Sequence, residues 1–498
     1  MKRVLRLVLV LGYSALGLCA CVGPNFHRPA PPRVDRYTAE PLPPQSASAL
    51  GPGGAAQKFL AQQVPKNWWT LFGSEEIDAL VTQALNANPS VQAATAALRQ
   101  ALEIAAAQRG AYFPTAQASF DPSRQRNAVG VLAPTLNSGT ALFNLYTAQV
   151  NVSYIPDVFG ANRRQVESLT ALAEANRFQL DATYLTLTAN VVTTAIQESA
   201  LRAQIAATER VIALERESLS VLRRELELGA IAEGDVFAQE AALAQLEVTL
   251  PPLNRQLQLS RDLLAVLTGR LPADFKPMRF ELDQLSLPAD LPLGVPSQLV
   301  DRRPDVRAAE AQLHAATAEV GVTIANMLPQ ITITGGIGSS ATAMGDLFKA
   351  GTGFWSAGAS LTQTLFEGGT LIHRKRAADA ALDQAGAMYR TAVLTAFQNV
   401  ADALHALNTD ADTLDAASRA ESAAQQSLTV AQHQLELGSV SYLALVNAEQ
   451  TYQQVVIALT QARASRLADT AALFQALGGS ISPVILPATA GVPGAAAH

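Results

Sequence analysis

Apolar and polar residues alternate with a period of two in four short stretches of the chain. From Tyr146 to Tyr154, tyrosine, alanine and valine alternate with threonine, glutamine, asparagine and serine. Such a period places the apolar side chains on one face of a β-strand. The pattern predicts four strands, over residues 115–127, 144–157, 330–340 and 354–366.

Two much longer stretches are typical of helices. Residues 161–228 contain no proline or glycine, and residues 370–437 contain no proline and Gly386 as their only glycine. At a rise of 1.5 Å per residue, each predicted helix is about 100 Å long, more than a compact domain can bury. Apolar residues return with the seven-residue spacing of helices that supercoil, at Ile205, Ile212, Leu219 and Leu226.

The order of these elements is duplicated. A glycine triplet returns 209 positions further along the chain: Gly160, Gly229 and Gly269 correspond to Gly369, Gly438 and Gly478. A pair of prolines also returns, Pro89 and Pro114 as Pro304 and Pro329. Because repeats set the architecture, we divide the chain accordingly. The divisions are a first repeat 67–271, a proline-rich linker 272–300, a second repeat 301–480 and a disordered tail 481–498.

Shorter helices complete each repeat. Proline is tolerated in the first turn of a helix, so Pro89 and Pro304 mark helix starts, and Ser74 is a cap for a short helix before them. Gly229 and Gly438 supply the positive φ of a helix C-cap and turn the chain back. The predicted shorter helices are 75–87, 90–112, 235–268, 304–327 and 442–477.

The N-terminus predicts a lipoprotein signal peptide over residues 1–20. A basic start precedes a short apolar run, and Leu18-Cys19-Ala20-Cys21 reads as a lipobox in which Cys21 is acylated after cleavage. The alternatives are an ordinary signal peptide with a cysteine nearby, or a short anchor. Residues 21–66 are rich in proline, alanine, glutamine and glycine, and we expect a weakly ordered tether there.

The amino-acid composition and the spacing of reactive residues exclude several classes of function. Charged residues make up 16% of the chain, the net charge is −6 and no basic block is present, so no nucleic-acid partner is expected. The six histidines do not have the spacing of zinc ligands. No nucleophile, base and orienting acid form a plausible motif. The sequence therefore predicts no catalytic residue, no metal, no cofactor and no enzyme.

Four strands are too few to close a barrel, and an open sheet edge in lipid leaves backbone groups unpaired. The strands must therefore close with copies of themselves or stay outside lipid. Their length of about ten residues suits a tilted membrane strand. The alternative, a soluble sandwich capped by helices, conflicts with the two long helices. We predict a mainly α protein with a small β part, in which a duplicated repeat forms long helical hairpins.

The chain resembles the outer-membrane efflux proteins, which are TolC-type channels, and the lipoprotein branch typified by OprM and NodT most of all. The resemblance covers about residues 21–480. It rests on Cys21-Val22-Gly23-Pro24-Asn25-Phe26, Trp68-Trp69-Thr70-Leu71-Phe72, Asn88-Pro89-Ser90, Val158-Phe159-Gly160, Arg302-Arg303-Pro304-Asp305-Val306-Arg307 and Leu365-Phe366-Glu367-Gly368-Gly369. Taken singly these motifs are weak, but their order and spacing together are specific.

The resemblance implies a homotrimer whose twelve strands form one barrel in the outer membrane and whose helices form a tunnel across the periplasm. It implies a lipid anchor in the outer membrane of a Gram-negative bacterium. It also implies a periplasmic adaptor (a membrane fusion protein) and an inner-membrane pump, which lipidation and the Arg302–Arg307 motif suggest is proton-driven. Family members bind no catalytic cofactor.

The helix ends farthest from the strands are the expected periplasmic tip, gate and adaptor contact. In many relatives an aspartate after the second turn forms an acidic ring, and here that stretch contains no acid. Glu233 and Asp235 at the first turn could supply an acidic ring in place of that aspartate. The preferred hypothesis is that Val440, Tyr442 and nearby hydrogen bonds close the tunnel. Plain hairpin geometry also accounts for these residues. The predicted tip residues are Gly229, Glu233, Asp235, Gly438, Val440, Ser441, Tyr442 and Leu443.

The leading hypothesis is the outer-membrane channel of a tripartite efflux system for small amphipathic or toxic compounds. The alternative within the family is a duct for type I secretion of a protein or peptide. From another class comes a structural lipoprotein that spans the periplasm as a strut.

Overall fold

The computed structural model describes residues 22–41, 43–126, 142–276 and 280–479. The predicted signal peptide 1–20, Cys21 and the predicted tail 481–498 lie outside these residues. The chain divides into two compact units. The first contains residues up to Arg28, Leu98–Ala175 and Ala309–Tyr389, and the second contains Pro29–Ala97, Asn176–Ala308 and the residues from Arg390 onward.

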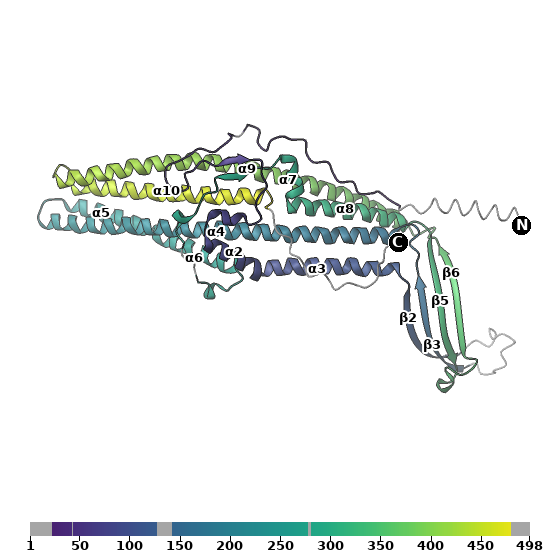
Figure 1. The fold of residues 1–498 in the computed structure, drawn as a ribbon. Helices are drawn as coiled ribbons and strands as arrows, with labels where there is room; N and C mark the ends of the chain where they lie inside the picture. The colour runs from purple at the N-terminus through teal and green to yellow at the C-terminus, as the bar shows by residue number, and fades with distance from the viewer. Residues whose placement is uncertain (1–21, 42, 127–141, 277–279, 480–498) are drawn as a thin grey trace. The chain divides into compact units, whose positions relative to one another are not determined.

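The first unit contains an antiparallel sheet of four strands in the order β2-β3-β5-β6 (Figure 1). The two central strands come from different repeats, and their ladder runs from Tyr146 opposite Ala341 to Tyr154 opposite Ile333. Each predicted strand overlaps one of these, with ends shifted by up to four residues. The strands are β2 Thr115–Arg126, β3 Leu142–Tyr154, β5 Gln330–Ala341 and β6 Gly353–Thr362.

This sheet exposes apolar side chains and open edges. Ile337 on β5 lies opposite Trp355 on β6, and these side chains are 66% and 78% exposed. Within the described part of the chain, β2 pairs only with β3 and β6 only with β5. Each outer strand therefore keeps one unpaired edge, and unpaired edges invite pairing with another chain.

Four helices, α3, α4, α8 and α9, contribute residues to both units, and a fifth, α2, lies in the second unit alone. Prolines mark the ends of several of these helices, because proline has no N–H to donate to a helical hydrogen bond. Pro89 and Pro304 occupy the first helical positions, and Pro114 and Pro329 follow the helix ends. The helices are α2 Glu75–Ala87, α3 Pro89–Arg109, α4 Ala161–Glu227, α8 Pro304–Ala325 and α9 Thr370–Glu436. Residues Gly110–Tyr112, expected in the α3 helix, form a separate 3-10 turn, η2.

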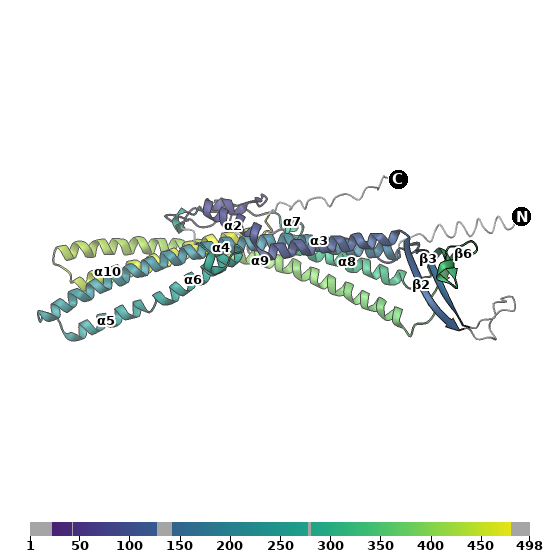
Figure 2. The ribbon, with the colours of Figure 1, turned by 90° about the horizontal axis from the view of Figure 1, so that it is seen from below.

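The second unit contains two helical hairpins, drawn in Figure 2 as pairs of antiparallel helices. In the second repeat, α9 returns through a single helix, α10 Tyr442–Ala476. In the first repeat, the single helix expected over 235–268 is instead two helices, α5 Glu233–Glu247 and α6 Leu250–Leu267. Pro251 and Pro252 explain the break, because neither can donate the backbone hydrogen bond that a continuous helix needs. No proline interrupts α10.

The proline motifs at the starts of α3 and α8 cap a neighbouring helix end in each repeat. Asn88 donates its side-chain N–H to the carbonyl of Leu267 at 2.9 Å, at the C-terminus of α6. In the second repeat Arg303 donates to the carbonyl of Ala476 at 2.9 Å, at the C-terminus of α10. Both groups satisfy a carbonyl that the helix leaves without a partner. The duplication therefore preserves the position of the cap while changing its chemistry.

The segment expected to be a tether, 21–66, contains little regular secondary structure in its described part, but it makes tertiary contacts. Strand β1, Lys58–Leu60, pairs in parallel with β4, Asp290–Pro292, which belongs to the linker. The linker also holds α7, Pro296–Arg302. Next comes η1, Trp68–Phe72, whose Trp68 is buried and stacks on Phe474 of α10 with ring centroids 5.3 Å apart. Long-range contacts that no local pattern reveals thus order this segment.

Candidate functional site

The first hairpin tip is the turn between α4 and α5. Gly229 has φ +74°, and its N–H donates to the carbonyl of Leu226 at 2.9 Å, so the glycine ends α4 as predicted for a left-handed C-cap. A carboxylate oxygen of Asp235 accepts from the backbone N–H of Ala232 at 3.3 Å, which caps the start of α5. Glu233 is exposed in the first turn of α5, where an acid is favourable. The two acids therefore have a local role in the hairpin.

The second tip repeats this geometry without the acids. Gly438 has φ +66° and donates to Leu435 at 2.9 Å, while Ser439 donates from its backbone N–H and its hydroxyl to the carbonyl of Gln434. Ser441 precedes α10 as its N-cap residue, yet its side chain makes no capping hydrogen bond. Val440 is half-buried. The side chain of Tyr442, predicted to help close the tunnel, lies outside what the structure describes.

Apolar side chains are exposed at both tips. Leu228 is 75% exposed, Leu437 is 69% exposed and Leu443 is 47% exposed. Just behind the first tip, Leu219, Leu222 and Val236 form a buried cluster that holds α4 against α5. The tips are therefore firmly built turns that present leucine side chains outward, and exposed apolar groups of this kind mark interaction surfaces.

A buried carboxylate that sequence reasoning did not single out joins the two hairpins. Glu215 on α4 is fully buried and accepts hydrogen bonds from the side-chain amides of Gln239 on α5 and Gln450 on α10. The side-chain amide of Gln204 on α4 also donates to the side-chain oxygen of Gln461 on α10 at 2.7 Å. In the sequence, Glu215 lies between Ile212 and Leu219 of the seven-residue apolar pattern. A charged residue between apolar positions of a helix seam is the sequence signal that could have indicated this bridge.

Within the first unit, the segment after Cys21 packs against α4 and α8. Phe26 stacks on His314 of α8 with ring centroids 4.4 Å apart, and His314 lies 2.9 Å from Glu167 of α4. Arg164 binds Glu167 at 2.8 Å and Asn25 at 2.6 Å. Burial alone would raise the pKa of the Glu167 carboxyl, but the hydrogen bonds from His314 and Arg164 outweigh it and hold that pKa below its usual value.

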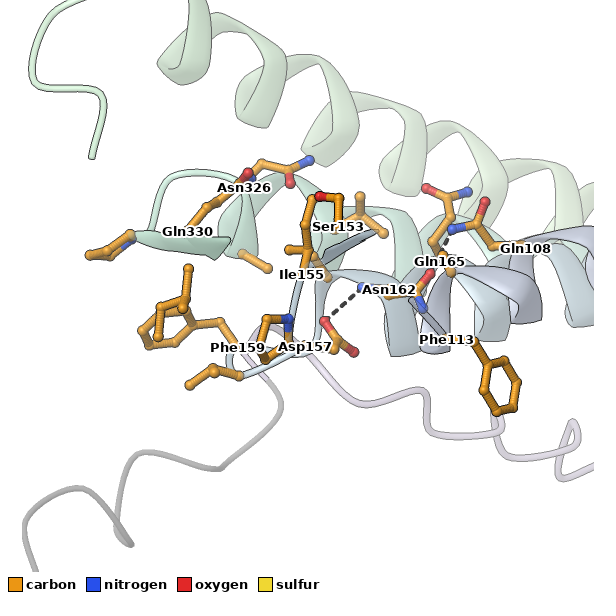
Figure 3. Close-up of a pocket in the computed structure, with 18 of the residues that line it drawn as sticks. Gln108, Phe113, Ser153, Ile155, Asp157, Phe159, Asn162, Gln165, Asn326 and Gln330 are labelled. Atoms are coloured by element: carbon orange, nitrogen blue, oxygen red, sulfur yellow. Dashed lines mark hydrogen bonds between the residues drawn. The ribbon is translucent and has the colours of Figure 1, made fainter. Parts of the chain in front are cut away.

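A cavity of about 390 Å³ lies where the strands of the first unit pass into helices (Figure 3). Asp157 fixes one wall, because its carboxylate accepts from the backbone N–H groups of Asn162 at 2.9 Å and Arg163 at 2.8 Å. Gln108 donates to the side-chain oxygen of Asn162 at 2.6 Å. Phe113 and Ile155 add apolar surface, so the cavity combines amide and apolar walls.

Two absences hold for the residues that the structure describes. Among them, no group of three or more histidine, cysteine, aspartate or glutamate side chains could hold a metal ion. Their helices also include none that is both long enough and apolar enough to pass through a membrane.

The comparison with protein families decides the assignment. The model of the family described as outer membrane efflux protein matches residues 80–270 and 295–479. The chain belongs to this family. Among characterised relatives, the toluene efflux pump outer membrane protein TtgC of Pseudomonas putida is 29% identical over 467 residues, covering 93% of each chain. The pyoverdine export outer membrane protein OpmQ of the same species is 28% identical, covering 84% of this chain and 89% of its own.

A solved structure supports the same assignment. The outer-membrane channel OprN superposes with a TM-score of 0.80 at 26% identity, covering 92% of this efflux protein and 99% of that channel. The long helical hairpins and the small sheet are thus the fold of an outer-membrane channel. The protein is the outer-membrane channel of a tripartite efflux system, which extends into the periplasm and works with an adaptor and an inner-membrane pump.

Proposed function

We propose that this efflux protein acts as a homotrimer whose sheets close into one twelve-stranded barrel in the outer membrane. The observation that carries this proposal is the sheet with an unpaired edge on both β2 and β6. In lipid each unpaired backbone group costs several kcal/mol, so an edge strand needs a partner there. Three copies of a four-stranded sheet supply every edge with a neighbour, and the exposed Trp355 and Ile337 then face lipid or the next protomer.

The hairpins of the second unit form the periplasmic tunnel in this arrangement, and their tips meet the adaptor. The exposed Leu228, Leu437 and Leu443 favour this role, because an adaptor helix can cover apolar groups that water cannot solvate well. At the first tip, Asp235 caps α5 and Glu233 lies in its first turn, and both also place negative charge near the tunnel end. Gly229 and Gly438 shape the turns, and we assign closure of the tunnel to the second tip, at Val440, Ser441 and Tyr442.

The cargo is a class of small amphipathic or toxic compounds. A wall with few charges and many small side chains binds solutes weakly, which suits conduction. The relatives named for toluene and pyoverdine handle small molecules, and this favours a small cargo over a polypeptide. The pump is proton-driven, the duct itself catalyses no reaction, and acylation of Cys21 adds a lipid anchor to the outer membrane.

Two measurements on the full-length protein in detergent test the proposal. Native mass spectrometry should give three chains per particle, and planar bilayers should show stepwise conductance. A monomeric, non-conducting particle would contradict the trimeric duct and favour a structural strut. In a strain that lacks its own outer-membrane efflux channels, the protein should restore resistance to small amphipathic drugs. Restored secretion of a polypeptide without restored drug resistance would favour the type I duct.

Two variants test the proposal that the hairpin tips contact the adaptor. Leu228→Glu and Leu443→Glu should abolish drug efflux while conductance and trimers persist, because a charge replaces an apolar contact with the adaptor. The matched control is Leu50→Glu, which alters a side chain that is also exposed but lies far from both tips. Full efflux by both tip variants would remove the leucines from the adaptor contact.

A further inference from the structure

The second repeat has two arginines near a helix start that the first repeat lacks. Arg374 and Arg376 lie within the first seven residues of α9. The residues 209 positions earlier, on α4, are Gln165 and Glu167. Glu167 is used inside the protein, because it pairs with His314 of α8 at 2.9 Å. A long helix can therefore start at this place without the two arginines, and their charge needs another explanation.

Neither arginine is paired within the part of the chain that the structure describes. Both side chains are exposed, whereas Lys375 between them forms an ion pair with Asp379 at 2.7 Å. Residues two positions apart point to different sides of a helix, so Arg374 and Arg376 extend from α9 in different directions. Each guanidinium group is therefore available to bind an anion of its own.

Exposed apolar side chains precede these cations along the chain. Leu365 and Phe366 lie between the end of β6 and the start of α9, and both are largely exposed. Phe113, directly before β2, is exposed as well. Aromatic side chains at the ends of the strands are typical of an outer-membrane barrel at the surface of the bilayer. From β6 to α9 the chain thus changes from apolar to cationic, as a bilayer changes from hydrocarbon to headgroups.

The dimensions of the sheet place this change at the right level. Strand β5 has 12 residues. At about 3.3 Å per residue and a tilt of about 40°, it spans about 30 Å, which is the thickness of the hydrocarbon core. Each headgroup layer adds roughly 5–8 Å. Arg374 and Arg376 lie about 6–9 Å along α9 from its first residue, and a long arginine stem can keep its guanidinium group in that layer.

The whole end of the sheet that joins the helices is cationic. Four segments of the first unit connect the strands to their helices, and together they contain five arginine or lysine side chains and two acidic ones. These segments are 109–114, 155–163, 326–329 and 363–376. The complete chain, in contrast, has a net charge of −6. A cationic surface of this kind attracts anionic lipids, and arginine binds a phosphate group through two parallel hydrogen bonds.

We propose that Arg374 and Arg376 bind the phosphate groups of anionic phospholipids in the periplasmic leaflet of the outer membrane. The helices start at this end of the sheet, so in the fold of an outer-membrane channel this end faces the periplasm. Each arginine binds one headgroup, while Leu365 and Phe366 contact the upper part of the acyl chains. This inference rests on the proposed barrel and adds a class of lipid that closure of the barrel does not itself require.

Native mass spectrometry of the full-length protein in detergent tests this inference. Phosphatidylglycerol and phosphatidylcholine with the same acyl chains are added in equal amounts, and the readout is the ratio of the two lipids that the protein retains. An arginine near a membrane surface favours an anionic lipid roughly fivefold, so the wild type should retain about five times more phosphatidylglycerol. Arg374→Gln and Arg376→Gln should each lower this excess, and the double variant should reduce it to less than about twofold.

Two controls separate the site from charge in general. Arg390→Gln/Arg419→Gln removes two exposed arginines from the same helix, about 20 Å or more further along, and should keep the wild-type ratio. Arg374→Lys/Arg376→Lys keeps both charges and should retain most of the excess. If the glutamine variants do not fold, the wild type alone still gives a test. High salt screens exposed charges, so its excess of phosphatidylglycerol should fall at high ionic strength.

Each outcome supports or overturns the inference. Equal retention of the two lipids by the wild type would overturn it, as would a wild-type excess in the double glutamine variant. Stronger retention of lipopolysaccharide than of phosphatidylglycerol would assign the arginines to the opposite leaflet and would also overturn it. The mass of the same particle gives the number of chains. A trimer without a lipid excess contradicts this inference alone, whereas a monomer that keeps the excess contradicts the trimeric barrel alone.

Discussion

The buried bridge at Glu215 offers a direct test of how the two hairpins are held together. Its carboxylate accepts from Gln239 within the first hairpin and from Gln450 in the second. Replacing Glu215 by alanine leaves both amides without this acceptor and removes the only described side chain that bonds to both. We expect the second hairpin to separate from the first more readily in this variant.

The structure sets the size of the effect. A hydrogen bond to a charged group contributes about 1.5–3 kcal/mol, so two such bonds contribute about 3–6 kcal/mol before other terms. Removing the carboxylate also removes the cost of burying its charge, which offsets part of the loss. A net weakening of about 2–4 kcal/mol remains, which corresponds to roughly 30- to 1000-fold in the equilibrium between joined and separated hairpins.

Hydrogen exchange along α10 and single-channel recording measure this change. Around Gln450, the Glu215→Ala variant should exchange at least tenfold faster than Glu217→Ala, a control that removes an exposed carboxylate from the same helix. Its channels should also stay open longer in planar bilayers. Glu215→Gln keeps one acceptor oxygen and should fall between the two. Equal exchange in Glu215→Ala and Glu217→Ala would refute the view that this bridge joins the hairpins.

Three further predictions concern the anchor, the core and the turns. Cys21→Ser should abolish acylation, detected as the loss of the lipid mass, while trimers persist; loss of trimers would mean that the barrel depends on the anchor. Trp68→Ala removes a buried, stacked indole and should lower the free energy of unfolding by about 3–5 kcal/mol in denaturant titrations. Gly269→Ala should lower the stability more than Gly229→Ala does. Both glycines have positive φ, so the backbone strain is similar. A Cβ at Gly269 would lie 2.5 Å from the carbonyl oxygen of Ala87, whereas a Cβ at Gly229 would meet open space. Equal thermal shifts would contradict that contact.

Much of the fold was visible in the sequence because its signals are local and repeated. Period-two alternation located the strands, and proline-free stretches located α4 and α9. The single helix predicted over residues 235–268 differs from the structure, because Pro251 and Pro252 interrupt the helical hydrogen bonds there. The break between α5 and α6 was therefore predictable.

The remaining features depend on contacts between distant positions. Gln450 meets Glu215 across 235 positions of sequence, and Arg466 meets Ser46 across 420. No period or motif indicates such pairs, because each partner looks like an ordinary polar residue on a helix or in a proline-rich segment. For the same reason, the sequence predicts only a weakly ordered tether for the N-terminal segment. Its composition is typical of disorder, yet tertiary hydrogen bonds hold it in place.

The open edges of the four-stranded sheet have a consequence for how the protein is made. In the proposed trimer, the backbone groups on the outer edges of β2 and β6 bond to neighbouring copies, so a single newly secreted chain leaves those edges unpaired. Maturation should then depend steeply on the local concentration of protomers, and a scarce chain would remain a target for periplasmic chaperones and proteases. The amount of functional channel would rise more sharply than the rate of synthesis, so a modest change in expression could switch efflux capacity on or off.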